Sequence, residues 1–178
     1  VRPVHVLHVT VLWLLSADLG LVYYMTQRLC GIPLWSRQLA LWSCGIWWFS
    51  VVLGTSSIPA GTNFGWEYAE LPTWIGWIPI KALSTVAFLM VVVNIFMTIA
   101  RRKYQQMYVS LWYIAGTMIW TSFTYVVGNF GINWVPGGIS KVNTSFFYVH
   151  NLVGLIFTPM GLAAAYYFLP KLTNTPIY

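Results

Sequence analysis

Only three histidines, His5, His8 and His150, occur in the 178 residues of the chain. Imidazole is a common ligand of haem iron and of copper. His5 and His8 are three residues apart and share one face of a helix, so their spacing does not decide which of them would bind a metal. The alternative is that each histidine only caps or hydrogen-bonds at the headgroup boundary of a membrane helix. Position alone leaves both interpretations open.

Asp18 is one of only three acidic residues, and it interrupts an apolar run. It lies roughly 20 Å along the helix from His5, at 1.5 Å per residue. An ionisable residue within a membrane span is a functional candidate, in this case for a proton relay. The alternative, which we favour, is a buried protonated carboxyl that is hydrogen-bonded to a neighbouring Ser or Tyr.

The composition of the chain is that of a membrane protein. Apolar types make up 58% of the chain and charged types 7%, whereas soluble domains are about 45–50% apolar and about 25% charged. This composition excludes a soluble globular enzyme and a disordered tail. A nucleic-acid binder is also excluded, because the nine basic residues are spread over the chain and form no basic patch. Cys30 and Cys44 form neither a CxxC pair nor a disulfide framework, and no signal-peptide pattern opens the sequence. We therefore expect a polytopic protein of the lipid bilayer.

Five mostly apolar runs are long enough to cross a bilayer as helices. We expect these spans at about residues 4–25, 39–58, 74–100, 107–127 and 146–169. Pro159 lies inside the fifth span, where a proline predicts a kink. The sequence thus predicts a single all-α transmembrane domain over residues 1–178.

The basic residues predict the orientation of this domain. The loops after the first and third spans, together with the C-terminal tail, carry six basic residues and no acid, whereas the charges of the opposite side cancel. Because positive charge favours the cytoplasmic side, we expect the N-terminus outside and the C-terminus in the cytoplasm. All three histidines then lie in the outer part of the membrane.

Five motifs, in order along the chain, resemble the catalytic subunit of the cbb-type cytochrome c oxidases, the C family of haem–copper oxidases. The strongest is Tyr148-Val149-His150-Asn151-Leu152-Val153-Gly154, continuing to Ala165-Tyr166-Tyr167-Phe168-Leu169-Pro170-Lys171, which resembles the helix with that family's first copper ligand. The others are Arg2-Pro3-Val4-His5, Trp66-Glu67-Tyr68-Ala69-Glu70-Leu71-Pro72, Gln106-Met107-Tyr108-Val109-Ser110-Leu111-Trp112-Tyr113 and the closing Pro176-Ile177-Tyr178. The resemblance implies that the five spans correspond to the second to sixth helices of a twelve-helix bundle.

The resemblance also implies roles for individual residues. His5 matches one of two axial ligands of the low-spin haem b, and His150 matches one of three histidines on the active-site copper. Glu70 matches a carboxylate that holds calcium beside the haem propionates, and Arg2 matches a residue that neutralises a propionate. His8 has no counterpart. The implied cofactors are haem b, a high-spin haem, copper and calcium.

The implied function is part of a respiratory terminal oxidase in a bacterial inner membrane, with the N-terminus periplasmic. It would transfer electrons from cytochrome c to dioxygen with proton translocation. The helices that carry the remaining ligands are absent from this sequence, so we expect a second chain to supply them in a split catalytic subunit. Membrane-anchored c-type cytochrome subunits are further expected partners. The alternative is a degenerate, non-catalytic structural subunit that binds no metal.

Nitric oxide reductases share this fold and are a second alternative. Their non-haem iron site uses a glutamate four residues after the histidine that matches His150, and Gly154 occupies that position here. Without that carboxylate, the site fits copper held by imidazoles better than iron. We therefore favour the oxidase.

Overall fold

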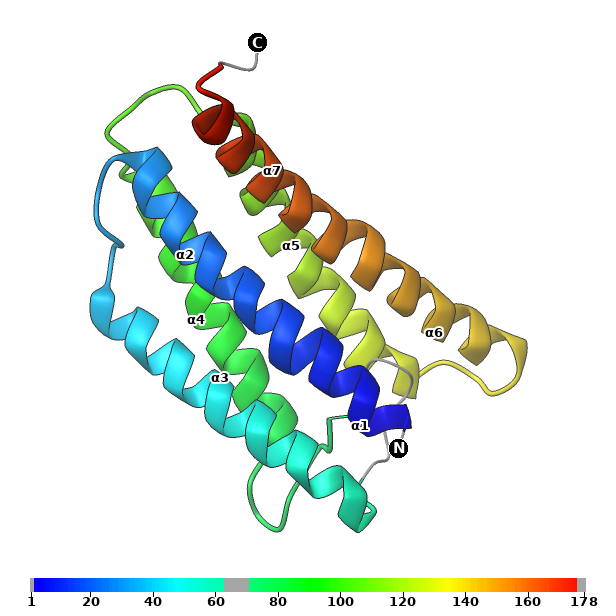
Figure 1. Ribbon diagram of the computed structural model, residues 1–178. Helices are drawn as coiled ribbons and strands as arrows, with labels where there is room; N and C mark the ends of the chain where they lie inside the picture. Colours follow the sequence, from blue (N-terminus) through cyan, green and yellow to red (C-terminus); the bar gives the residue numbers. More distant parts are fainter. Residues whose placement is uncertain (1, 63–70, 176–178) are drawn as a thin grey trace.

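The computed structural model describes residues 2–62 and 71–175, and these residues form five long helical runs that lie side by side in a bundle (Figure 1). Within the described residues there is no β-strand, only an isolated bridge between Ile75 and Ile78. The first run comprises α1 (Arg2–Leu7), the π-helical η1 (His8–Leu15) and α2 (Ser16–Cys30). The second comprises α3 (Arg37–Ser57) and the short 3₁₀ turn η2 (Ile58–Ala60).

The other three runs complete the bundle. The third is α4 (Ile80–Ala100), and the fourth is α5 (Val109–Asn129), which is followed by the 3₁₀ turn η3 (Gly131–Asn133). The fifth consists of α6 (Ile139–Leu152), the π-helical η4 (Val153–Phe157) and α7 (Thr158–Thr173). The main hydrophobic core takes residues from all five runs.

The predicted all-α membrane fold is confirmed. Among the described residues, the runs over 2–30, 37–60, 80–100 and 139–173 are long and apolar enough to cross a membrane. The fourth run, α5, is as long as α4 but richer in Thr, Ser, Trp and Tyr, which makes it less apolar. Several of its polar side chains, including Thr117, Thr121 and Thr124, are buried in the bundle.

The ends of two runs differ from the predicted spans. The third helix begins at Ile80 rather than near residue 74, because Ile75 and Ile78 pair across a tight turn and Pro79 precedes the helix. The fifth run extends from Ile139 to Thr173, beyond both ends of its predicted span. Immediately before Pro159 it widens into η4. The π turn fits the absence of a proline N–H, and the hydroxyl of Thr158 donates to the carbonyl of Val153 at 2.9 Å.

Polar residues inside α4 tie the loop that precedes α3 to the bundle. The side chain of Asn94 accepts a hydrogen bond from the N–H of Ser36 at 3.0 Å and donates one to the carbonyl of Ser36 at 2.9 Å. The hydroxyl of Thr98 accepts from the N–H of Trp35 at 3.0 Å. Ser36 also caps α3, because its hydroxyl accepts from the N–H of Leu39 at 3.1 Å. These bonds fix where α3 starts beside α4.

A glycine lets α5 and α6 approach closely. A Cβ atom at Gly128 would lie only 2.0 Å from a ring carbon of Tyr148. The aromatic ring therefore occupies the space that a side chain would need. This contact orients the part of α6 that precedes His150.

Candidate metal-ligand positions

His5 and His8 have different surroundings on the first run. His5 lies on α1 and is exposed. His8 is partly buried, and its Nδ1 donates to the carbonyl of Val4 at 2.7 Å. One imidazole nitrogen of His8 is thus used by its own helix. The exposed imidazole of His5 is better placed to reach a group outside the bundle.

His150 is exposed on α6. Its imidazole is stacked on the ring of Phe146, with centroids 6.0 Å apart and an angle of 24° between the planes. Phe146 is itself 68% exposed. Because an aromatic neighbour at i−4 limits how the imidazole can rotate, the ring is held pointing away from the core.

Both histidines precede irregular helical turns. His5 lies three residues before the start of η1, and His150 lies three residues before the start of η4. π-Helical turns are rare and are frequently found at functional sites. The two positions therefore share a local backbone feature as well as a residue type.

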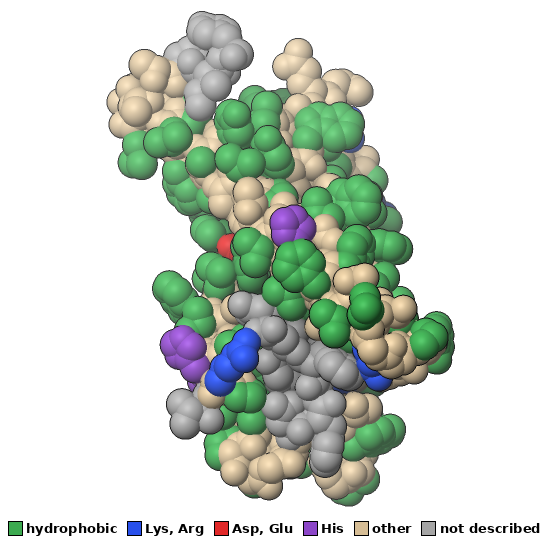
Figure 2. Space-filling model, turned by 90° about the vertical axis from the view of Figure 1, so that its right-hand side faces the viewer, with side chains coloured by type: hydrophobic (Ala, Val, Ile, Leu, Met, Phe, Trp, Pro, Cys, Tyr) green, Lys and Arg blue, Asp and Glu red, His purple; other side chains and the backbone are tan. Residues whose placement is uncertain are grey.

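The described residues do not assemble a complete metal site. They contain no group of three or more His, Cys, Asp or Glu side chains that could hold a metal ion. Figure 2 shows histidine side chains at two separate places on one face of the molecule, with acidic atoms visible on the same face. Each exposed imidazole fits the role of one ligand in a site that is completed from outside the bundle. Together they do not make such a site.

The other two predicted site residues are near the same end of the first run or outside the described part. Arg2 is exposed on α1 three residues before His5, so the two share a helix face. Glu70 lies outside the described residues, as does most of the motif around it and the closing Pro176-Ile177-Tyr178. Leu71, which follows Glu70, is buried in a small cluster with Leu7. Leu71 thus packs in the same cluster as Leu7, which lies two residues after His5 in the sequence.

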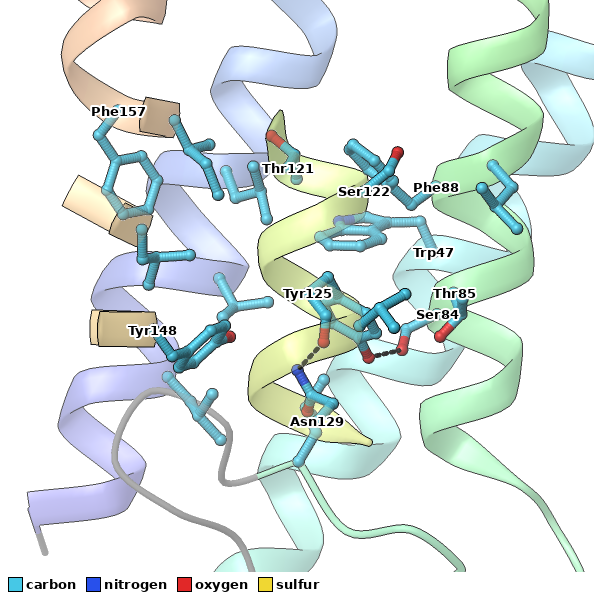
Figure 3. Close-up of a pocket in the computed structure, with 18 residues that line it drawn as sticks. Trp47, Ser84, Thr85, Phe88, Thr121, Ser122, Tyr125, Asn129, Tyr148 and Phe157 are labelled. Carbon is cyan, nitrogen blue, oxygen red and sulfur yellow. Dashed lines mark hydrogen bonds between the residues drawn. The ribbon is translucent and has the colours of Figure 1, made fainter. Parts of the chain in front are cut away.

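A cavity of about 120 Å³ lies between the helices (Figure 3). The described residues that line it are mostly apolar, and none of them is His, Cys, Asp or Glu. Leu7 and Tyr148 both line it, and they lie two residues from His5 and His150 respectively. Two side chains two residues apart on a helix point in different directions. Side chains of α1 and α6 therefore line one cavity, but neither His5 nor His150 is among its lining residues.

The cavity is also lined by polar side chains that were not among the functional residues predicted from the sequence. The hydroxyls of Tyr125 and Ser84 lie 3.3 Å apart, and the amide of Asn129 donates to the carbonyl of Tyr125 at 3.2 Å. The hydroxyl of Thr121 has no hydrogen-bond partner among the described residues. These residues follow no spacing that distinguishes them from other hydroxyl side chains of membrane helices, so no sequence signal identifies them.

Asp18 is buried, with 8% of its surface exposed. Its Oδ2 atom has no hydrogen-bond partner among the described residues. The expected bond from a neighbouring Ser or Tyr is therefore not made to this oxygen. Burial of a carboxyl with an unpaired oxygen is costly and favours the neutral form.

Comparison with known proteins identifies the family. The whole chain, residues 1–178, matches the family model for cytochrome c and quinol oxidase polypeptide I. The chain belongs to this family. Members of the polypeptide I family that resemble it include the cbb3-type cytochrome c oxidase subunit CcoN1 of Stutzerimonas stutzeri, at 30% identity over 99% of this chain and 38% of that protein.

Two further members give the same picture. Cytochrome c oxidase subunit 1 of Rhodobacter capsulatus is 27% identical over 99% of this chain and 34% of its own length. The bacteroid cytochrome c oxidase subunit 1 homolog of Bradyrhizobium diazoefficiens is 28% identical over 99% of this chain and 33% of its own length. The chain thus spans about a third of the length of these relatives. Membership of the polypeptide I family, together with the apolar helices, supports an integral membrane protein.

Proposed function

We propose that this chain forms part of subunit I of a cbb-type terminal oxidase in a bacterial inner membrane, and that it contributes one ligand to each of two metal centres. The observation that carries the proposal is that His5 and His150, on helices from opposite ends of the sequence, are both exposed and lie two residues from side chains that line one cavity. The family match over the whole chain supplies the chemical context. The complex would use electrons from cytochrome c to reduce dioxygen, with proton translocation.

The proposed roles follow from the surroundings of each residue. His5 would be one axial ligand of a low-spin haem b, with Arg2 on the same helix face beside a propionate. His150 would be one of the copper ligands, and its stacking on Phe146 would restrict the direction of the imidazole. When bound, the haems and copper would supply the electron transfer and the binding of dioxygen. Glu70, outside the described residues, would hold calcium.

The remaining ligands would come from helices beyond this sequence. They would be carried either by a second chain, which makes subunit I a split subunit, or by further residues of the same polypeptide. Membrane helices form individually and then associate, so both arrangements are physically accessible. Membrane-anchored c-type cytochrome subunits are the proposed electron donors. The end of the bundle with Arg28, Arg101 and Lys171 would face the cytoplasm.

The first test is a reduced-minus-oxidised optical spectrum of the natively purified complex that contains this chain, repeated with carbon monoxide. A low-spin b-type signal together with a high-spin haem that binds carbon monoxide would support the proposal. Absence of any haem signal would contradict it and favour a structural subunit. Metal analysis of the same sample should find copper, whereas extra non-haem iron would indicate a nitric oxide reductase.

A further inference from the structure

Five buried polar side-chain atoms of the described residues have no hydrogen-bond partner, and all five belong to α2 and α5. They are the Oδ2 atom of Asp18 and the hydroxyl oxygens of Thr26, Thr117, Thr121 and Thr124. The two helices contact each other in the bundle. A buried polar group without a partner is costly, so this concentration of unpaired atoms along one helix pair indicates a polar ligand.

The threonines of α5 differ from other buried hydroxyl side chains of the chain. Inside a helix such a hydroxyl can donate to the carbonyl four residues earlier. The hydroxyl of Thr55 does so to the carbonyl of Val51 at 2.8 Å, and the buried Thr98 makes the same kind of bond. Thr117 and Thr121 are 1% and 5% exposed, yet neither makes this bond. Their hydroxyls are therefore available to a partner other than their own helix.

Two aromatic contacts relate the heights of α2 and α5 in the bundle. The rings of Tyr24 on α2 and Tyr167 on α7 meet with centroids 6.0 Å apart. The ring of Tyr113 on α5 stacks on that of Tyr166, the preceding residue of α7, with centroids 5.8 Å apart. Because both contacts are made to consecutive residues of one helix, Tyr24 and Tyr113 lie at about the same height.

Asp18 then lies between the heights of two unpaired threonines. The helices α2 and α5 run in opposite directions (Figure 1), so Asp18 is displaced from Tyr24 toward the same end of the bundle as Thr117 and Thr121 are from Tyr113. Asp18 is six residues from Tyr24, which is about 9 Å at 1.5 Å per residue. Thr117 and Thr121 are four and eight residues from Tyr113, which is about 6 and 12 Å.

No lysine or arginine among the described residues of the helices that contact α2 lies at this height. These cations lie near helix ends, at Arg28 on α2, Arg37 on α3, Lys81 on α4 and Lys171 on α7, and α5 has no charged residue. The Oδ2 atom of Asp18 is covered by the bundle itself, so a helix from outside cannot reach it without displacing this packing. A neutral carboxylic acid bonded to buried water meets both conditions.

We propose that buried water lies between α2 and α5 and joins the protonated carboxyl of Asp18 to the hydroxyls of Thr117 and Thr121. A buried water typically makes about three hydrogen bonds to polar groups that otherwise have no partner, and these three side chains offer that number. Thr121 also lines the cavity of about 120 Å³, which is far larger than the roughly 10–15 Å³ that one water needs. The site therefore holds a proton inside the membrane without an ion pair. This inference does not depend on the proposed haem and copper ligands.

The first measurement is infrared spectroscopy of the purified complex that contains the full chain, at neutral pH. Subtracting the spectrum of Asp18→Asn from that of the unaltered complex isolates the bands of this side chain. We expect the carbonyl-stretch band of a protonated carboxylic acid, shifted to lower frequency in deuterated water. The bands of an ionised carboxylate in its place would overturn the proposal.

The water itself is detected in the same difference spectrum. In the O–H stretching region we expect a band that shifts when the sample is exchanged into heavy-oxygen water, because that exchange moves the bands of water and not those of the hydroxyl side chains. A difference spectrum with no such band would show that Asp18 is dry, and the proposal would then be wrong.

Variants of the hydroxyls keep Asp18 and remain informative if Asp18→Asn does not assemble. In T117V/T121V the carboxylic acid band should move to higher frequency, because the water that bonds to the carboxyl loses its anchors. The matched control is Thr55→Val, which removes a buried hydroxyl that already bonds to its own helix and should leave the band in place. An unshifted band in T117V/T121V, or the same shift in the control, would contradict the proposal. None of these bands requires a haem, so the result is separate from the optical spectrum that tests the proposed function.

Discussion

His5 and His150 lie three residues before the two π-helical segments of the structure's described residues, and both expose their imidazoles. In each case the residue two positions away along the helix, Leu7 or Tyr148, lines the shared cavity. Each of the two helices thus lines the cavity with one side chain and exposes its histidine on a different face. The π-helical turn after each histidine changes which residues of the following helix face the core.

The first prediction separates His5 from its neighbour on the same helix. We expect His5→Ala to remove the low-spin b-type signal from the spectrum of the complex, because an axial ligand is lost. His8→Ala is the matched control and should leave that signal in place, since Nδ1 of His8 already bonds to Val4. Loss of the signal in His8→Ala alone would transfer the ligand role to His8.

The second prediction concerns copper. We expect His150→Ala to keep the low-spin haem signal but to abolish oxygen consumption by the complex. The loss should exceed the roughly 10–100-fold effect of removing an outer partner of a metal ligand. Phe146→Leu, which removes the stacked ring but no ligand, should reduce the rate much less. Oxygen consumption at the normal rate in His150→Ala would show that this histidine holds no copper.

The third prediction tests the contact between α5 and α6. Gly128→Ala should destabilise the protein by about 1–3 kcal/mol, because the new Cβ overlaps the ring of Tyr148. Gly116→Ala on the same helix has open space and should stabilise by up to about 1 kcal/mol through helix propensity. Thermal unfolding in detergent, followed by circular dichroism, measures both. Similar unfolding temperatures for the two variants would mean that this contact is not tight.

The fourth prediction concerns the loop before α3. Asn94→Ala removes both hydrogen bonds to Ser36 and leaves backbone groups unpaired beside a buried position. We expect a loss of about 1–3 kcal/mol in stability. The control is Asn133→Ala, which loses only a long 3.4 Å bond within its own segment and should change stability by less than about 0.5 kcal/mol. Thermal unfolding in detergent measures both variants. Equal losses of stability in Asn94→Ala and Asn133→Ala would contradict a structural role for Asn94.

Sequence alone determined the helical runs. A membrane helix must satisfy its backbone hydrogen bonds internally, so a long apolar stretch predicts its own secondary structure. This is why the membrane helices and the family were recognisable from local patterns and motifs. The helices differ from the predicted third and fifth spans where local geometry outweighed hydrophobicity, at the turn before Pro79 and at the start of α6 at Ile139.

Only the tertiary structure decided which faces of these helices meet. The pairing of Asn94 with Ser36 joins α4 to the start of α3, and the fit of Tyr148 against Gly128 joins α6 to α5. The outward direction of His5 and His150 was decided in the same way. In a soluble helix an apolar stripe marks the buried face. In a membrane the lipid is as apolar as the protein interior, so hydrophobic pattern cannot distinguish the two, and packing must.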